Sequence, residues 1–182
     1  VLGATGVVGR EILKILVENN VPYNEIKFLA SAKSAGKKIE FKGEEHTIIE
    51  ATPESFEGVN IVLASAGGST SLKLAPEAVK RGCVFIDNSS AYRMDKDCPL
   101  VIVGVNDNDL KNHKGIIPNP NCSTSQLMLV LKPLHDYAKI KRMIVSTYQA
   151  VSGAGIAAIN ELKENTLSLI HISEPTRRSY IS

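Results

Sequence analysis

Gly3-Ala4-Thr5-Gly6-Val7-Val8-Gly9 follows the apolar pair Val1-Leu2 and opens a helical pattern that runs to Glu18. Glycines between a strand and a helix permit a tight turn, bring the backbone close to a pyrophosphate, and let the helix pack closely on the strand. The spacing is G-x-x-G-x-x-G rather than G-x-G-x-x-G, which leaves a glycine turn without a ligand as the alternative. This stretch predicts the first turn of a dinucleotide-binding α/β domain.

Outward from this turn, short apolar runs alternate with helical patterns, which predicts a parallel sheet with crossover helices. Four further strands are expected at residues 26–30, 61–64, 84–86 and 101–103. A small hairpin is expected around Lys42-Gly43, between residues 39–41 and 46–49. One helix is expected through residues 72–79, and another over residues 7–18 with Val8, Ile12, Ile15 and Leu16 on its inner face.

A second domain is predicted after Pro118-Asn119-Pro120-Asn121, which interrupts the alternation. Residues 123–137 have the pattern of a helix in which Leu127, Val130, Leu131 and Leu134 pack inward, and Pro133 is expected to bend it or end it early. The long apolar run 140–151 predicts a strand of a different sheet. The predicted fold class is therefore α/β: a Rossmann-type, mostly parallel sheet with helices on both faces in residues 1–120, followed from residue 121 by the start of a second domain of α+β type.

Composition excludes several classes of protein. The chain has 182 residues, 43% of them hydrophobic, which is enough for a folded core. A formal charge of +2 leaves no electrostatic footprint for nucleic acid. No apolar run approaches the ~20 residues that span a bilayer, and three cysteines do not form a disulfide framework. We expect a soluble, cytoplasmic α/β protein.

The end of the second predicted strand indicates which dinucleotide is bound. NAD enzymes place an acidic residue there, ~20 residues after the glycine turn, to hold the ribose 2′-hydroxyl. This chain has Ser31, Lys33 and Ser34 instead and no carboxylate, which suits a 2′-phosphate. The sequence predicts NADP; an ordinary polar loop is the alternative.

A candidate nucleophile stands at the start of the helix that follows Asn119-Pro120-Asn121. Cys122 would lie among exposed N–H groups at the positive end of the helix dipole, and this position favours the thiolate over the thiol. Such a cysteine beside a dinucleotide site suggests catalysis through a thioester, with a buried helix-start cysteine as the alternative. Cys83 reads as core and Cys98 as incidental, and neither has a spacing that suggests zinc, so no metal site is expected.

Six blocks of this sequence together resemble the aspartate-semialdehyde dehydrogenase family. They are the glycine turn, Phe28-Leu29-Ala30-Ser31, Ser65-Ala66-Gly67-Gly68-Ser69, Ile86-Asp87-Asn88-Ser89-Ser90-Ala91-Tyr92-Arg93, Asn119-Pro120-Asn121-Cys122-Ser123-Thr124, and Ser146-Thr147-Tyr148-Gln149-Ala150-Val151-Ser152-Gly153-Ala154-Gly155. The resemblance runs from Val1 to about Thr166, and it implies that residues 121–166 are the truncated start of an α+β catalytic and dimerisation domain.

The resemblance implies NADP-dependent interconversion of aspartyl-4-phosphate with aspartate 4-semialdehyde and phosphate, in the biosynthesis of lysine, diaminopimelate, threonine and methionine. It implies that Cys122 is the acyl-thioester nucleophile and that Asn121 helps to shape the pocket around its thiolate. It also implies that Arg93 holds the substrate phosphate and that Gln149 orients the amino-acid end of the substrate or its reacting carbonyl. For the cofactor it implies contacts from Gly3, Thr5, Gly6, Val7, Val8, Ser31, Lys33, Ser34, Ser152 and Gly153. The full-length parent is expected to be a homodimer or homotetramer. A reductase of the N-acetylglutamyl-phosphate type and a non-catalytic dinucleotide-binding module are the alternatives.

Both ends of the chain carry expectations of their own. Val1 is not an initiator methionine, so we expect the chain to begin inside its first strand. Residues 167–182 do not match the family; they resemble a translated sequencing adapter, and we expect a non-native tail, with a family-specific insertion as the alternative. The acid–base histidine that the family supplies would then be absent, since His171 lies in that tail. The chain as written is expected to be an inactive N-terminal fragment.

Overall fold

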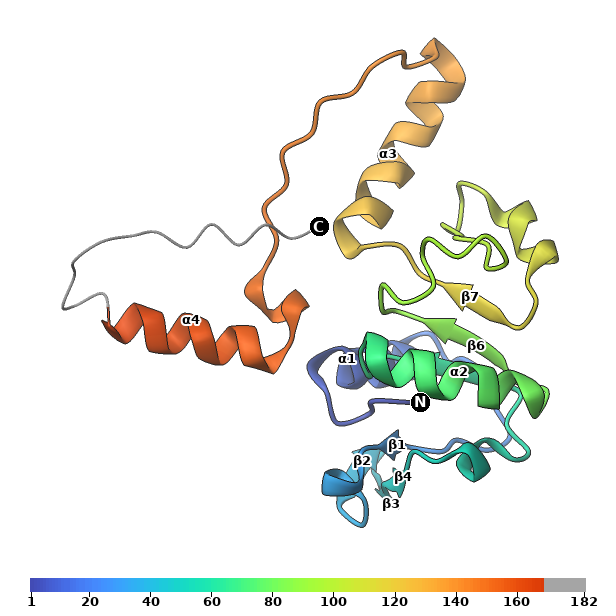
Figure 1. Cartoon of the computed structure of the whole chain (residues 1–182), viewed down its shortest axis with the longest axis vertical. Helices are drawn as coiled ribbons and strands as arrows, with labels where there is room; N and C mark the ends of the chain where they lie inside the picture. The colour runs from blue at the N-terminus through green and yellow to red at the C-terminus, as the bar shows by residue number, and fades with distance from the viewer. Residues whose placement is uncertain (169–182) are drawn as a thin grey trace. The chain divides into compact units, whose positions relative to one another are not determined.

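Residues 1–168 are described by the computed structural model, and the chain forms two compact units, Val1–Thr147 and Tyr148–Ser182 (Figure 1). The predicted tail, including His171, lies almost wholly outside the described residues. None of the described helices is long and apolar enough to cross a membrane.

A parallel sheet organises the first unit. Its strands are β1 (Leu29–Ala30), β4 (Ile49–Glu50), β5 (Ile61–Ala64), β6 (Val84–Asp87) and β7 (Ile116–Pro118). Leu2 forms parallel bridges with both Leu29 and Ala64, so it acts as a minimal first strand between β1 and β5. The spatial order is β4, β1, Leu2, β5, β6, β7, which is the 3-2-1-4-5-6 order of dinucleotide-binding folds when Leu2 is counted as strand one.

Two hydrophobic clusters lie on opposite faces of this sheet because neighbouring strand residues point to opposite sides. Phe28 and Ala30 belong to the cluster that holds Leu13 of helix α1 (Val7–Glu18). Leu29 belongs to the cluster that holds the buried apolar residues of helix α2 (Gly68–Lys80). The prediction of helices on both faces is confirmed.

The small hairpin is also confirmed. Strands β2 (Lys38–Phe41) and β3 (Glu44–Thr47) pair antiparallel, and Lys42 and Gly43 between them both have positive φ. Two consecutive residues with positive φ make a tight hairpin turn that matches the strand twist. Short 3-10 turns connect the other elements at Ala32–Ser34, Pro53–Phe56 and Asp107–Asn112.

Helix α1 has the predicted bounds but a different inner face. Gly9 and Leu13 are its buried residues, whereas Val8 and Ile15 are 44% and 46% exposed. The helix is rotated toward Gly9 because a position without a side chain can approach the preceding turn more closely than a valine can. The predicted inner face was therefore wrong for Val8 and Ile15.

The strand predicted at residues 101–103 was wrong; residues 101 and 102 have no regular secondary structure and Val103 begins a turn. The side chain of Asn106 accepts a hydrogen bond from Ile102 N at 2.8 Å and donates one to Leu100 O at 3.0 Å. The Asn106 side chain therefore forms hydrogen bonds with backbone groups that would pair with a neighbouring strand if this segment were part of the sheet. The last strand of the sheet is β7 instead, which the sequence patterns missed.

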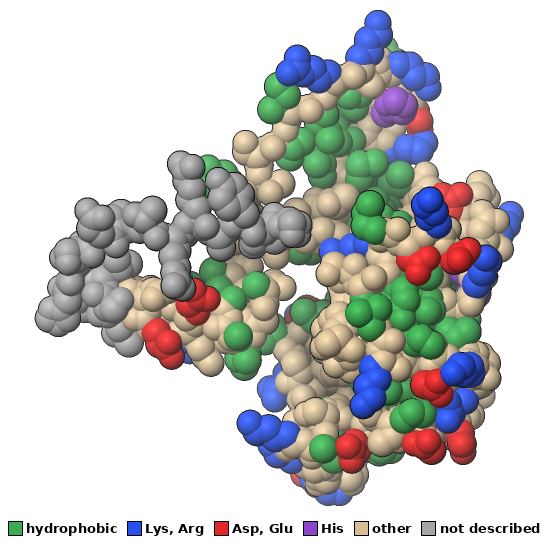
Figure 2. All heavy atoms as spheres, in the orientation of Figure 1, with side chains coloured by type: hydrophobic (Ala, Val, Ile, Leu, Met, Phe, Trp, Pro, Cys, Tyr) green, Lys and Arg blue, Asp and Glu red, His purple; other side chains and the backbone are tan. Residues whose placement is uncertain are grey.

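Helix α3 (Cys122–Ala138) begins and ends within a residue of its prediction, and it continues past Pro133 rather than ending there. Its predicted packing was wrong, since no residue of α3 is buried and Val130 and Leu134 are 61% and 52% exposed. Hydrophobic side chains accordingly gather on the surface of α3 in Figure 2. No element of the first unit covers this face.

The strand predicted at residues 140–151 is absent as well. Residues 141–150 are exposed and have no regular secondary structure, because nothing in the described part of the chain pairs with them. The second unit contains a 3-10 turn at Val151–Ala154 and helix α4 (Ile156–Ser168).

Candidate active site

Five polar segments follow the carboxyl ends of neighbouring parallel strands, and those ends share one edge of the sheet. They are residues 3–9 after Leu2, 31–34 after β1, 65–68 after β5, 88–93 after β6 and 119–122 after β7. The strand order reverses between Leu2 and β5, and ligands of such sheets bind in the crevice at this switch point. The topology therefore brings the predicted cofactor, substrate and nucleophile segments of the first unit to one edge.

The glycine turn is built from bare backbone. Gly3 has a φ of 84°, and a Cβ on it would lie 2.9 Å from the carbonyl carbon and oxygen of Ser65. A Cβ on Gly9 would lie 2.0 Å from the carbonyl oxygen of Gly3. Side chains at either position would separate helix, turn and neighbouring strand, so the glycines are required by close approach.

The start of α1 fits a phosphate. Gly6 is the N-cap and provides no side-chain cap, and the first turn contains no acidic residue. The first amides of a helix have no acceptors inside it, so those of Val7 and Val8 can bind an anion at the positive end of the helix dipole. Gly6, Val7 and Val8 are exposed, and Thr5 is half-buried beside them.

The segment after β1 fits a second anionic group. Ser31 and Lys33 are exposed and Ser34 is half-buried, in a turn closed by a hydrogen bond from Ser34 N to Ser31 O at 2.8 Å. No carboxylate stands within this turn. Two hydroxyls and one ammonium group can donate hydrogen bonds to an anionic group.

Arg93 joins two loops of the site. Its Nε donates to Asn119 O at 2.8 Å, and its Nη2 donates to Asn88 O at 3.0 Å and to Pro120 O at 3.4 Å. The guanidinium therefore ties the loop after β6 to the residues just before Cys122. Its Nη1 makes no hydrogen bond within residues 1–168, which leaves one nitrogen for a substrate oxygen.

Cys122 is exposed and is the first residue of α3. Asn121 caps this helix: its Oδ1 accepts hydrogen bonds from Ser123 N at 3.0 Å and Ser123 Oγ at 2.6 Å, and lies 3.7 Å from Cys122 Sγ. The cap holds the first turn in shape and places an amide oxygen beside the sulfur. The predicted position of Cys122 at a helix start is confirmed.

The other two cysteines are unsuited to nucleophilic chemistry. The thiol of Cys83 is buried and donates to Val59 O at 3.0 Å, and burial raises its pKa above the usual range. Burial also raises the pKa of the half-buried Cys98, with further upward contributions from Asp95 and Asp97. Within residues 1–168, no group of three or more His, Cys, Asp or Glu side chains is arranged to hold a metal ion.

The remaining predicted residues belong to the second unit and are described only within it. Gln149, Ser152 and Gly153 are all exposed. A Cβ on Gly153 would lie 2.5 Å from Gln149 Nε2, so the amide of Gln149 rests over this glycine. The structure thus brings these two predicted residues together.

Sequence reasoning missed the groups that connect these loops. Asp87 is fully buried between Ser71 and Ser89, and Asn119 donates its side-chain amide to Asn88 Oδ1 at 2.7 Å. All of these except Ser71 lie within the blocks that carry the family resemblance, but only Arg93, Asn121 and Cys122 were given roles in those two blocks. Asp87 could have been singled out from the sequence, because it is a carboxylate at the end of a predicted apolar strand.

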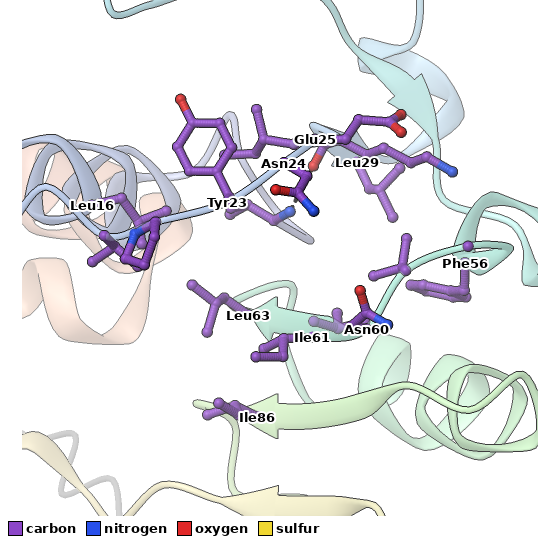
Figure 3. A pocket seen from close by; sticks show the side chains of 18 residues that line it. Leu16, Tyr23, Asn24, Glu25, Leu29, Phe56, Asn60, Ile61, Leu63 and Ile86 are labelled. Carbon is purple, nitrogen blue, oxygen red and sulfur yellow. Dashed lines mark hydrogen bonds between the residues drawn. The ribbon is translucent and has the colours of Figure 1, made fainter.

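An apolar cavity of about 580 Å³ lies elsewhere on the first unit (Figure 3). Its lining includes Lys27, Asn60 and Ile61, which stand before or at the amino ends of β1 and β5. The cavity is therefore distinct from the polar edge at the carboxyl ends.

A doubly wound sheet, a glycine turn that opens a helix without a side-chain cap, and an exposed cysteine at a helix start are features of a dinucleotide-dependent oxidoreductase. Residues 1–113 match the model of the semialdehyde dehydrogenase NAD-binding domain, and residues 131–181 match that of the semialdehyde dehydrogenase dimerisation domain. The second match extends through residue 181, so the expectation that residues 167–182 do not match the family was wrong. The chain belongs to the semialdehyde dehydrogenase family.

Its relatives are aspartate-semialdehyde dehydrogenases. The one from Bacillus subtilis is 54% identical over 174 residues, which are 96% of this chain and 50% of that protein. The crystal structure of aspartate semialdehyde dehydrogenase II complexed with ASA, from Vibrio cholerae, is 43% identical with a TM-score of 0.86 and covers 93% of this chain and 51% of its own. A Candida albicans aspartate semialdehyde dehydrogenase with NADP is 30% identical with a TM-score of 0.61 and covers 76% of this chain and 46% of its own. The chain spans about half the length of the curated relatives it matches.

Proposed function

We propose that this chain supplies the nucleotide site and the nucleophile of an NADP-dependent aspartate-semialdehyde dehydrogenase. The observation that carries the proposal is the position of Cys122, an exposed cysteine at a helix start on the same sheet edge as an uncapped glycine turn. The relatives named above and the NADP bound to one of them support the substrate and the cofactor.

In this proposal the cofactor is held by the chain's own donors. The amides of Val7 and Val8, beside Thr5 and Gly6, bind the pyrophosphate, and Ser31, Lys33 and Ser34 bind the 2′-phosphate. Ser152 and Gly153 contact the nicotinamide side. When bound, NADPH supplies the hydride that reduces the acyl carbon of the substrate.

The chain's side chains perform the acyl transfer. The Cys122 thiolate attacks the acyl carbon of aspartyl-4-phosphate, so that a carbon–sulfur bond forms as the carbon–oxygen bond to phosphate breaks. Phosphate leaves with that oxygen and its electron pair, next to the free Nη1 of Arg93. Asn121 keeps the sulfur at the helix start, and Gln149 orients the substrate. After reduction, the sulfur departs as thiolate and the semialdehyde is released.

Nucleotide binding tests the cofactor half of the proposal. We expect the purified chain to bind 2′,5′-ADP at least about tenfold more tightly than 5′-AMP in isothermal titration calorimetry, with the difference shrinking at high salt. Lys33→Glu should abolish the preference, because a carboxylate repels the 2′-phosphate. Lys37→Glu, a nearby exposed change outside the predicted site, is the matched control. Equal affinities for the two nucleotides would refute the choice of NADP.

Turnover tests the complete reaction. The chain as written should not oxidise NADPH in the presence of aspartyl phosphate, because it lacks the acid–base histidine that the family implies. A protein that continues this sequence through a full-length catalytic domain should do so, and its Cys122→Ser variant should not. Higher activity with N-acetylglutamyl phosphate would instead favour the other reductase type.

A further inference from the structure

Asp87 is a buried carboxylate that the proposed chemistry does not use. It ends β6, its exposed fraction is 0%, and within residues 1–168 it forms no ion pair. Its Oδ1 accepts hydrogen bonds from Ser71 Oγ at 2.7 Å and Ser89 N at 3.0 Å, and its Oδ2 accepts one from Ser89 Oγ at 2.6 Å. Burying a charge is unfavourable unless such donors satisfy it, so a carboxylate kept here without a cation points to a role beyond packing.

One side of this carboxylate reaches the cofactor crevice. Ser71 lies in the first turn of α2, which begins at Gly68 directly after the loop that follows β5. Gly67, the N-cap, has a φ of 87° and provides no side-chain cap. The bond from Ser71 to Asp87 therefore holds the start of α2 against the end of β6.

On its other side, Asp87 is linked to the loop before Cys122 by hydrogen bonds of its main chain and of Asn88, Ser89 and Arg93. The main-chain oxygen of Asp87 accepts from Asn119 N at 2.7 Å, and the neighbouring Asn88 accepts from the Asn119 side chain at 2.7 Å. Ser89 Oγ, bound to Asp87, also accepts from Ala91 N at 3.1 Å, which shapes the loop that carries Arg93. Arg93 then binds the carbonyls of Asn119 and Pro120, the residues that lead into Cys122 by way of Asn121.

We propose that Asp87 is a positioning residue that couples the start of α2 to the Cys122 loop, so that the cofactor crevice and the nucleophile keep one relative geometry. This inference rests on the proposed role of Cys122 as nucleophile. Positioning of this kind matters because a displacement of about 1 Å at a reacting group can reduce a rate ~100-fold.

Three substitutions separate the two sides of the coupling. Asp87→Asn weakens both, Ser71→Ala removes only the bond to α2, and Asn119→Ala removes only the side-chain bond to Asn88. Leu74→Ala is the matched control, because Leu74 is buried on the same helix one turn from Ser71 and does not bind Asp87. If Asp87→Asn does not fold, Ser89→Ala replaces it, and Ser89→Thr should restore the wild-type behaviour because it keeps the hydroxyl.

The measurements are amide hydrogen exchange followed by mass spectrometry and the rate at which iodoacetamide modifies Cys122. Asp87→Asn should speed exchange in residues 68–75 and 119–125 and change the Cys122 rate by about threefold or more. Ser71→Ala should affect only the first segment. Asn119→Ala should affect only the second and should reproduce the change in Cys122 rate.

The outcomes separate this inference from the proposed function. If Asp87→Asn matches Leu74→Ala in both segments and in the Cys122 rate, Asp87 only stabilises the fold and the inference is overturned. If wild-type Cys122 reacts no faster than Cys98, the proposed nucleophile is refuted, and the exchange pattern still decides whether Asp87 couples the two loops.

Discussion

Gly9 touches Gly3 through backbone alone: a Cβ at Gly9 would lie 2.0 Å from the Gly3 carbonyl oxygen and 2.8 Å from its carbon. Helix α1 therefore sits closer to the end of the first strand than any other residue at this position would allow. This contact positions the free amides at the start of α1 at the edge of the sheet.

We expect Gly9→Ala to lower the free energy of unfolding by about 3 kcal/mol or more, because the clash is with backbone that cannot rotate away. Urea denaturation followed by circular dichroism measures the change. Gly68→Ala is the control, since its Cβ would meet nothing closer than 3.9 Å and alanine suits a helix better than glycine. Equal effects of the two substitutions would contradict the close-contact argument.

The three thiols should react in the order of their exposure. Cys122 is exposed, Cys98 is half-buried and Cys83 is buried, and burial raises the pKa of the last two. With limiting iodoacetamide at pH 7.5, peptide mass spectrometry should find the first label on Cys122. Cys122→Ser should remove the fast phase, whereas Cys98→Ser should leave it intact. A first label on Cys83 would mean that the core opens more readily than the structure implies.

Arg93→Lys should lower stability although it keeps the charge. A single ammonium cannot reach the carbonyls of Asn88, Asn119 and Pro120 as the guanidinium does. Since hydrogen bonds from charged donors contribute ~1.5–3 kcal/mol, we expect a loss of about 2 kcal/mol in urea denaturation. Arg10→Lys, at an exposed position, should change stability by less than about 0.5 kcal/mol.

Glu77 should make stability depend on pH in the acid range. Hydrogen bonds from Lys80 and then Arg81 hold the pKa of its carboxyl below the usual value. A carboxyl with a lower pKa in the folded state contributes stability above its unfolded pKa of ~4.3, and that contribution is lost as the pH falls through the folded value. The urea midpoint of the wild-type chain should therefore fall as the pH is lowered from about 5 to about 3, and the midpoint of Glu77→Gln should fall less over the same range. Glu11→Gln, whose carboxylate makes only a long exposed pair with Lys14, is the control.

Local sequence was sufficient wherever one segment decides its own structure. The bounds of α1 and the Lys42-Gly43 hairpin were predictable because glycine turns, caps and apolar periodicity act over a few residues. Cys122 could be placed at a helix start for the same reason, since Asn121 is a good N-cap.

Pairing between distant segments was not predictable in this way. Residues 101–103 and 116–118 are both short apolar runs, yet only the second lies beside β6, because Asn106 binds the backbone of the first. The apolar run at 140–151 met no strand partner among residues 1–168, and β propensity without a partner does not form a sheet.

The sequence by itself determined the class of fold, the glycine turn, the basic and hydroxyl donors after β1, and the cysteine at the start of α3, since each depends on neighbours within a few residues. Only the tertiary structure decided that two nitrogens of Arg93 donate hydrogen bonds to the loop before Cys122, and that Asp87 lies buried between Ser71 and Ser89. Those contacts join residues up to 27 positions apart, and they form only once parallel strands have brought their carboxyl ends to one edge of the sheet.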